Sequence, residues 1–327
     1  MRIVFMGTPD FAVGALKAII QAGHQVCAVV TQPDKPKGRG REMQYTPVKV
    51  CALEYGIPVF QPSSVKEPDA VEMLRAYDAE LFVVAAFGQI LSEEILSMPK
   101  YGCVNIHASL LPKYRGAGPI QWAIINGEKE TGVTIMQMEK GLDTGDILLV
   151  SKVDIDEKET GDSLHDKLAL AGAELIVEAI PQIESGTLTP IRQKDEDSSY
   201  ARMLQKSMGK IDWEKPARQI ERLVRGLNSW PSAYTSYHGR TLKIWESSLD
   251  DRKGTDNGAV PGEMQSKVDE ALGSEPGTIT AVKKDAFFVQ TGEGILKVTQ
   301  VQPEGKKRMP VKDFLLGYQM REGEKLS

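Results

Sequence analysis

Residues 2–31, RIVFMGTPDFAVGALKAIIQAGHQVCAVVT, decide the fold class. Residues 2–6 form a short apolar run that is typical of a buried strand, and the apolar spacing over residues 11–22 predicts a helix that Asp10 can cap. Residues 25–31 are apolar and β-branched enough to form a second strand. Because a strand, a helix and a strand in this order build a βαβ unit, the sequence predicts an α/β domain with a parallel sheet.

The predicted sheet continues along the chain and then changes character. Residues 79–86 and 102–108 are further apolar runs typical of buried strands, and residues 92–98 between them predict a helix. From residue 132 onward apolar and polar residues alternate, so residues 132–138 and 146–153 predict an antiparallel pair around a glycine-rich loop.

A second domain is predicted after the long helical pattern of residues 163–184. Residues 190–208 are mostly polar and are interpreted as a linker, and residues 216–227 predict a helix. Short β-type runs with glycine-containing turns then predict a small C-terminal β-barrel of the oligonucleotide-binding type; these runs are residues 234–237, 242–245, 277–282, 286–291 and 295–301. We expect a catalytic domain at 1–189, a linker at 190–208 and a barrel domain at 209–327.

Length and composition agree with two ordinary globular domains. The chain has 327 residues, of which 41% are hydrophobic and 26% are charged. This composition excludes collagen-like and disordered proteins. The three cysteines are widely spaced and form no CxxC pair, which suits a reducing compartment. No run approaches the roughly 20 apolar residues of a membrane span. We therefore expect a cytoplasmic protein without a membrane partner, and a monomer because no segment marks an extra interface.

The charge of the chain is unevenly distributed. The formal net charge is −5, but residues 1–209 carry 21 basic and 28 acidic side chains, whereas residues 210–327 carry 19 basic and 17 acidic ones. The acidic stretch 249–275 holds three basic and seven acidic residues, so the rest of the C-terminal part has 16 basic against 10 acidic side chains. This pattern indicates a basic module that could bind nucleic acid, although charges that only solvate a surface would look the same.

Two segments carry candidate catalytic groups. Asn105 and His107 stand two residues apart in a predicted strand, so their side chains project from the same face. An amide beside an imidazole can stabilise a developing oxyanion and transfer a proton, although a buried polar pair can also simply satisfy itself. The loop of residues 140–146 adds Asp143 and Asp146; either carboxylate could orient a histidine or act as a base, and turn chemistry alone also explains them.

Two further motifs concern cofactors and polyanions. The turn at residues 7–10 does not continue as G-x-G-x-x-G, because Pro9 and Ala12 occupy the later glycine positions, which argues against an NAD-linked oxidoreductase. Residues 35–41 carry four cations among glycines and a proline, typical of an exposed loop that can meet phosphates or merely be solvated; the cations are Lys35, Lys37, Arg39 and Arg41. The four histidines have no metal-ligand spacing, so we expect no metal.

Taken together, these segments resemble the methionyl-tRNA formyltransferase family over nearly the whole chain. The runs NIHASLLPKYRG (105–116), GVTIMQM (132–138) and GLDTGD (141–146) are similar to the wider superfamily of formyltetrahydrofolate-using enzymes. Four features narrow the resemblance to this family, namely GTPDFA (7–12), QPDKPKGRGR (32–41), IDW (211–213) and NSWP (228–231).

The resemblance implies a function and a set of site residues. The N-terminal domain would be a Rossmann-like α/β domain with a mostly parallel sheet and would bind 10-formyltetrahydrofolate. The enzyme would transfer the formyl group to the free amino group of methionyl initiator tRNA for translation initiation. Asn105, His107 and Asp143 would be catalytic. The folate site would be lined by Ser109, Leu110, Leu111 and Pro112, and the tRNA would meet the C-terminal barrel and the loop with Lys35, Lys37, Arg39 and Arg41.

Other functions stay open at this stage. The nearest alternative is a formyltransferase that acts on a small amine, such as a sugar nucleotide or glycinamide ribonucleotide, which would need neither the basic loop nor the barrel. A non-catalytic RNA-binding protein would explain the basic module, but it would not need Asn105, His107 and Asp143 together.

Overall fold

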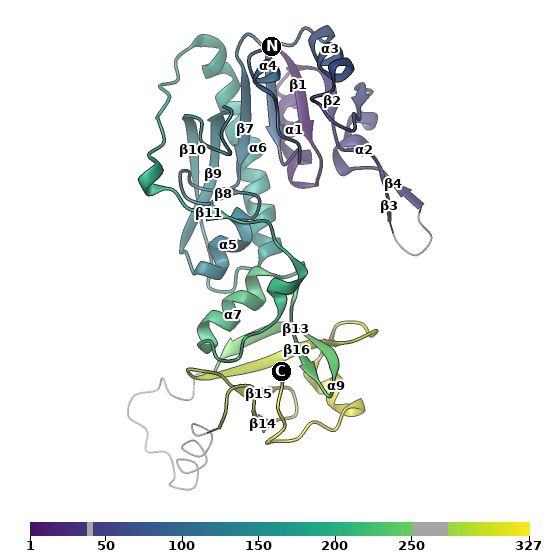
Figure 1. Cartoon of the computed structure of the whole chain (residues 1–327), viewed down its shortest axis with the longest axis vertical. Helices are drawn as coiled ribbons and strands as arrows, with labels where there is room; N and C mark the ends of the chain where they lie inside the picture. The colour runs from purple at the N-terminus through teal and green to yellow at the C-terminus, as the bar shows by residue number, and fades with distance from the viewer. Residues whose placement is uncertain (38–41, 251–273) are drawn as a thin grey trace. The chain divides into compact units, whose positions relative to one another are not determined.

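A computed structural model describes residues 1–37, 42–250 and 274–327 of the chain (Figure 1). The described chain divides into two compact units. The first unit is Met1–Ile120, Lys129–Ile155 and Ser163–Arg202, and the second is Gln121–Glu128, Asp156–Asp162 and Met203–Ser327. Two short segments from the first half of the sequence thus cluster with the second unit, and the domain boundaries expected at residues 189 and 209 stay a prediction.

The first unit contains the predicted mostly parallel sheet. Its strand order is β10-β9-β7-β6-β1-β2-β5. The parallel strands are β1 (Arg2–Gly7), β2 (Gln25–Val30), β5 (Val59–Phe60), β6 (Leu81–Ala85) and β7 (Cys103–His107). At one edge, β9 (Glu130–Gln137) runs antiparallel to β7, and β10 (Ile147–Asp154) antiparallel to β9.

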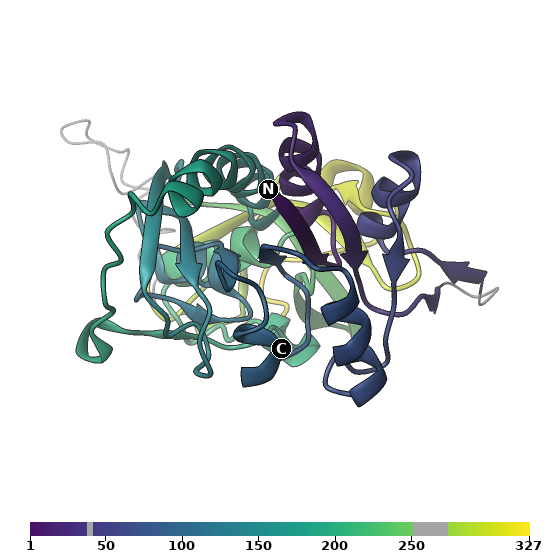
Figure 2. The same cartoon turned by 90° about the horizontal axis from the view of Figure 1, so that it is seen from above.

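Helices cover both faces of this sheet, as the view from above shows (Figure 2). They are α1 (Phe11–Gln21), α2 (Pro47–Glu54), α3 (Pro68–Ala76), α4 (Glu93–Leu96) and α6 (Gly161–Ser185), while α5 (Pro119–Asn126) is shared between the two units. Asp10 caps α1 as predicted, because its carboxylate accepts a hydrogen bond from Phe11 N. Gly172 lets α6 approach β7 closely, since an added Cβ would lie 2.8 Å from Ile106 Cγ2.

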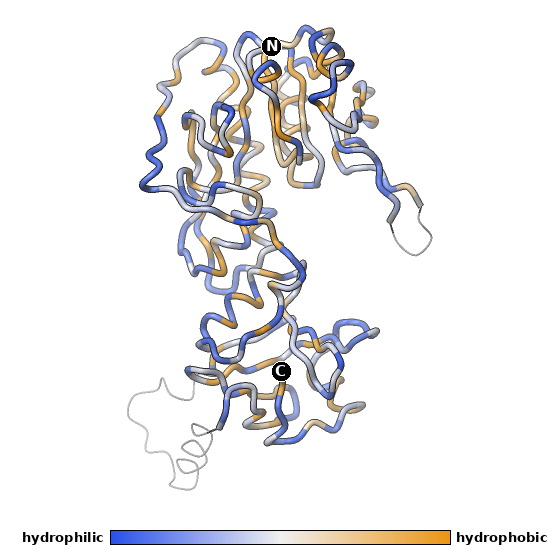
Figure 3. Tube along the Cα trace, viewed as in Figure 1, coloured by the Kyte–Doolittle hydropathy of each residue, from blue (hydrophilic) through white to orange (hydrophobic). Residues whose placement is uncertain are grey.

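The core of the first unit follows the alternation of its strands. Val4 and Met6 pack on one face with Leu74 of α3 and Ile95 of α4. Hydropathy along the chain shows the apolar residues gathered on the central strands (Figure 3). Burial on both faces explains why these strands are apolar throughout rather than alternating.

The second unit is built on one antiparallel sheet of order β12-β13-β16-β15-β14, with β17 paired to β16. Its strands are β12 (Ala233–Tyr237), β13 (Arg240–Leu249), β14 (Ile279–Val282), β15 (Phe287–Gln290), β16 (Ile295–Pro303) and β17 (Met309–Pro310), with helices α7 (Ala217–Gly226) and α9 (Val311–Gly317). Trp213 is buried in the core, and its indole N–H donates to Thr235 Oγ1 at 3.1 Å. All five predicted strands of this region are present, and the fold class is confirmed.

Two segments have more regular structure than the sequence predicts. Strand β11 (Tyr200–Ala201), inside the predicted linker, pairs in parallel with β8 (Arg115–Gly116). The basic loop begins with strand β3 (Lys35–Lys37), which pairs antiparallel with β4 (Glu42–Gln44). Strands of two or three residues are too short to show a period-2 pattern, so the sequence could not reveal them.

Candidate active site

The carboxyl edge of the parallel sheet carries the candidate site. The loops that follow β1 and β6 meet there, because Thr8 Oγ1 donates to the carbonyl oxygen of Phe87 at 2.9 Å. Strand β7 ends at the same edge with His107. Ligands of open parallel sheets bind at this edge, where the loops diverge and leave room.

Asn105 and His107 lie two residues apart on β7, as predicted, and pair with Met136 and Thr134 of β9. His107 is only 5% exposed, whereas Asn105 is half-buried. The amide of Asn105 makes no side-chain hydrogen bond to any residue that the structure describes. An amide without an internal partner, next to a buried imidazole, is available to a bound substrate.

The ring of His107 is held from one side. Its Nε2 lies 3.0 Å from the carbonyl oxygen of Tyr114. Because a carbonyl oxygen only accepts, Nε2 carries the proton of this bond. The other nitrogen, Nδ1, lies 3.8 Å from Asp143 Oδ2, which is within reach of an ion pair but too long for a good hydrogen bond. His107 therefore has one nitrogen fixed by the backbone and one that faces a carboxylate.

The loop between β9 and β10 places Asp143, rather than Asp146, beside His107. Asp143 Oδ2 accepts a hydrogen bond from Gly116 N at 2.7 Å, and the residue adopts a φ of 52°. Gly145 is required nearby, since an added Cβ would lie 1.8 Å from the carbonyl oxygen of Gln137. Asp146 takes part through its backbone, whose carbonyl accepts from Gln137 N at 2.9 Å. Of the two carboxylates that the sequence left open, the structure brings Asp143 to the histidine.

The four predicted folate residues differ in what they expose. Ser109 is buried, and its hydroxyl donates to the carbonyl oxygen of Lys113 at 2.7 Å. Leu111 is buried in a small cluster with Met136 and Ile147. Leu110 and Pro112 keep partly exposed apolar surface. The side chains of Ser109 and Leu111 therefore shape the loop, and those of Leu110 and Pro112 are the ones that a flat ligand could contact.

Sequence reasoning missed three groups around the site. The carbonyl of Tyr114 holds His107, the hydroxyl of Thr134 donates to the carbonyl oxygen of Ser109 at 2.7 Å, and Gln193 bonds to the Asp143 loop. Every residue type offers the carbonyl that Tyr114 contributes, so no residue pattern could identify it. Gln193 lies in a polar segment and is distant from Asp143 in sequence, which also leaves no local signal.

The predicted phosphate-contacting residues fall at the β3–β4 hairpin. Lys35 is exposed, and Lys37 is the last residue of β3. Arg39 and Arg41 lie outside the described residues. Asp34 precedes the hairpin and bonds Lys49 Nζ at 2.5 Å and Gln61 Nε2 at 2.8 Å. Partial burial opposes ionisation, but these hydrogen bonds and the charge of Lys49 outweigh it and lower the pKa of the Asp34 carboxyl.

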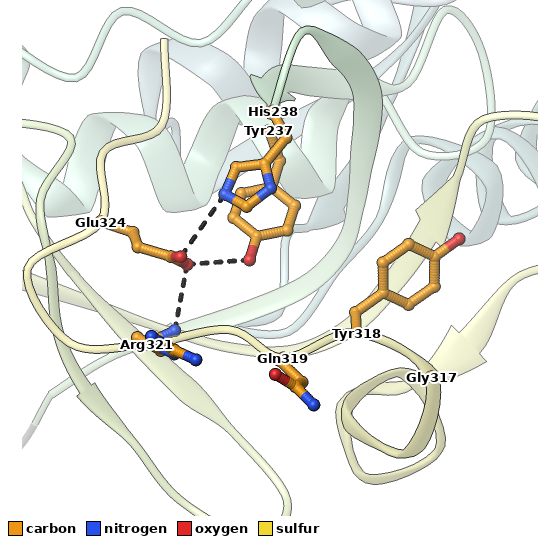
Figure 4. A pocket seen from close by; sticks show the side chains of 7 residues that line it. All are labelled: Tyr237, His238, Gly317, Tyr318, Gln319, Arg321 and Glu324. Atoms are coloured by element: carbon orange, nitrogen blue, oxygen red, sulfur yellow. Dashed lines mark hydrogen bonds and ion pairs between the residues drawn. The ribbon is translucent and has the colours of Figure 1, made fainter.

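The second unit has a hollow of about 400 Å³ that contains no predicted catalytic residue (Figure 4). It is lined by Tyr237, His238, Gly317, Tyr318, Gln319, Arg321 and Glu324. The ring of His238 stacks on that of Tyr237 with centroids 4.1 Å apart. Glu324 accepts from the Tyr237 hydroxyl at 2.8 Å and from Arg321 N at 3.0 Å. Burial and the hydrogen bond to Glu324 raise the pKa of Tyr237. The hydrogen bond from Arg321 N, followed by those from Tyr237 and His238, lowers the pKa of Glu324.

Metal and membrane features are absent from the described part of the chain. Within residues 1–37, 42–250 and 274–327, no group of three or more His, Cys, Asp or Glu side chains could hold a metal ion. In the same ranges no helix has both the length and the apolar character needed to span a bilayer.

Comparison with known proteins identifies both halves of the sequence. A family model described as formyl transferase matches residues 1–180, and one described as formyl transferase, C-terminal domain, matches residues 203–319. A methionyl-tRNA formyltransferase of Agathobacter rectalis is 53% identical over 323 residues, covering 99% of this chain and 98% of that protein. Another, of Geobacter metallireducens, is 47% identical over 326 residues, covering 100% and 98%.

Solved structures share the fold at lower identity. WlaRD, a sugar 3N-formyl transferase solved with dTDP and 5-N-formyl-THF, matches with a TM-score of 0.63 and 20% identity over 94% of this chain and 99% of that one. HypX from Aquifex aeolicus in complex with tetrahydrofolic acid matches with a TM-score of 0.62 and 17% identity over 100% of this chain and 50% of that one. The chain thus spans about half the length of HypX.

Proposed function

The chain belongs to the methionyl-tRNA formyltransferase family, and on that premise we propose that Asn105, His107 and Asp143 catalyse formyl transfer to the amino group of methionyl initiator tRNA. The formyl donor is derived from folate, and we identify it as 10-formyltetrahydrofolate. One observation carries the residue assignment: the partner-free amide of Asn105 lies on the same strand as His107, whose Nδ1 faces Asp143 at 3.8 Å.

The reaction needs a hydrogen-bond donor that stabilises the negative charge developing on the formyl oxygen. The neutral amine of the methionyl group attacks the formyl carbon on N10 of the folate, so this carbon becomes tetrahedral and its oxygen becomes an oxyanion. The amide of Asn105 donates a hydrogen bond to that oxygen, an interaction worth on the order of 10²–10³ in rate. Because Nε2 of His107 is bonded to the Tyr114 carbonyl, Nδ1 is the ring nitrogen that can serve the reacting groups.

Proton transfer completes the step. A C–N bond forms to the amine and the bond from the formyl carbon to N10 breaks, so the amine loses one proton and N10 gains one. His107 and Asp143 are the ionisable pair at this position, and the carboxylate stabilises positive charge that develops on the ring. Tetrahydrofolate and formylmethionyl-tRNA are the products. Leu110 and Pro112, with partly exposed apolar surface, suit contact with the flat ring of the folate.

Contacts to tRNA are proposed for both units separately. In the first unit, Lys35 and Lys37 of β3, with Arg39 and Arg41 beyond it, would neutralise phosphates. In the second unit, the hollow combines stacked rings with Arg321, whose guanidinium has no hydrogen-bond or ion-pair partner among the described residues. Aromatic faces beside a free cation suit an unpaired nucleotide. The cytoplasmic location and the monomeric state stay predictions.

The test of the function is transfer of labelled formyl from 10-formyltetrahydrofolate to purified methionyl initiator tRNA. Elongator methionyl-tRNA and glycinamide ribonucleotide serve as alternative acceptors in the same assay. We expect label on the initiator tRNA alone. Label on glycinamide ribonucleotide instead would favour the small-amine alternative, for which the cations at the β3–β4 hairpin would have no role in binding the acceptor.

A further inference from the structure

The segment 191–201, which we call the strap, is bonded to both loops that build the active site. At one end, Ile191 and Ile147 exchange two backbone hydrogen bonds of 2.9 Å, at the start of β10. At the other end, Arg115 N donates to the carbonyl oxygen of Ser199 at 2.8 Å, and β11 pairs with β8. The strap therefore belongs to the catalytic loops, although its composition is that of a linker.

Gln193, the third residue of the strap, makes the most side-chain bonds to the catalytic loops among the strap residues that the structure describes. Its side chain is buried, and its Nε2 donates to the carbonyl oxygens of Asp143 and Gly145 at 2.9 and 2.7 Å. Its Oε1 accepts from Arg115 Nε at 3.0 Å. Both amide protons and the amide oxygen are thus used in the Asp143 loop and in the loop after β7, which fixes the two loops to each other.

The strap also supports the opposite side of His107. Tyr114 N donates to Ser199 Oγ at 2.9 Å, and the carbonyl of the same Tyr114 accepts the bond from His107 Nε2. Tyr114 has a φ of 60°, an uncommon conformation for a bulky residue, and Asp143 also has a positive φ. Conformations of this kind persist only where surrounding bonds enforce them.

We propose that Gln193 is a positioning residue for formyl transfer, which holds the Asp143 carboxylate at Nδ1 of His107. The inference rests on the proposed function. Gln193 touches no reacting atom in this scheme, and acts through the backbone carbonyls at residues 143 and 145 and through its bond from Arg115. Without its two donors, these carbonyls lose their bonds, the loop relaxes, and the ion-pair distance of 3.8 Å is no longer maintained.

The test is Gln193→Met in the full chain, which keeps the side-chain length and removes both donors together with the acceptor of the Arg115 bond. We expect kcat to fall about 10- to 100-fold with the KM of tRNA and folate within about twofold, because a displacement of about 1 Å costs rate rather than binding. The pH profile of kcat should move toward that of Asp143→Asn. Glu196→Gln, whose exposed carboxylate bonds to no described residue, is the matched control and should behave as wild type.

A double mutant separates positioning from general damage. If Gln193 acts through Asp143, then Gln193→Met adds no further loss in an Asp143→Asn background, whereas independent roles multiply. Multiplied losses, or a Gln193→Met enzyme within about twofold of wild type, would overturn the inference. Gln193→Glu, which also lacks the two donors, repeats the test should the methionine variant not fold. A wild-type chain that formylates no tRNA would instead refute the proposed function.

Discussion

The two histidines His107 and His238 lie in contrasting environments, one buried and one exposed. His107 is 5% exposed and is fixed by a backbone carbonyl and a carboxylate from two different loops. The His238 side chain is 64% exposed, on the hairpin between β12 and β13, stacked on Tyr237 and within 3.4 Å of Glu324. The first arrangement is pre-organised for a transition state, and the second leaves a face and a nearby cation open to a ligand.

This difference predicts different kinetic consequences. Changes around His107 should lower kcat, because the groups there act on a charge that exists only during the reaction. Changes around His238 should alter tRNA affinity and its salt dependence, because exposed cations act through phosphates.

The largest effect is expected from removing the donors themselves. Asn105→Ala should lower kcat on the order of 10²–10³-fold, since it deletes the donor to the oxyanion. His107→Ala should lower kcat on the order of 10²–10⁴-fold, since it deletes the group that transfers the proton. Single-turnover formyl transfer measures the loss, and circular dichroism confirms the fold. A folded variant with near-full transfer activity would show that the oxyanion assignment is wrong.

The next effect comes from the backbone that carries Asp143. Gly145→Ala would place a Cβ 1.8 Å from the carbonyl oxygen of Gln137, so the loop must shift and move Asp143 away from His107. We expect a kcat loss of about 10- to 100-fold. Gly14→Ala in α1 is the control, since its Cβ would meet only ordinary contacts at 3.7 Å. Equal activity of the two variants would mean that the loop conformation is unimportant for catalysis.

A smaller effect is expected at the hollow. Arg321→Ala should raise the KM of tRNA several-fold with kcat nearly unchanged, and should reduce the slope of log affinity against log salt by about one. Filter binding of initiator tRNA at several salt concentrations measures this slope. A fall in kcat with unchanged salt dependence would mean that Arg321 serves catalysis rather than tRNA binding. The hollow and the site around His107 would then no longer differ in function.

The sequence could predict the groups that act through their own side chains within one element. Asn105 and His107 follow from the period of two in β7, and a carboxylate in residues 140–146 follows from the loop composition. The residue pattern alone left Asp143 and Asp146 open, because the choice depends on the tight turn at Gly145, and only the family resemblance pointed to Asp143. Gln193 was hidden for a different reason: its partners are backbone carbonyls of a distant loop.

The smallest effect is a pH dependence of stability at the hollow. The bond from Arg321 N, with those from Tyr237 and His238, lowers the pKa of Glu324, so its ionised form is favoured in the folded state. A carboxyl with a lowered pKa adds stability above its unfolded-state pKa, and this contribution is lost as the pH falls through the folded-state pKa. The melting temperature of wild type should therefore exceed that of Glu324→Gln at pH 7, and this difference in melting temperature should shrink below about pH 5. Glu214→Gln, an exposed carboxyl of the same unit, should show no such trend in thermal denaturation. A constant difference at all pH values would mean that Glu324 stabilises the hollow by packing rather than by charge, and its contact with His238 at 3.4 Å would then add no electrostatic stability.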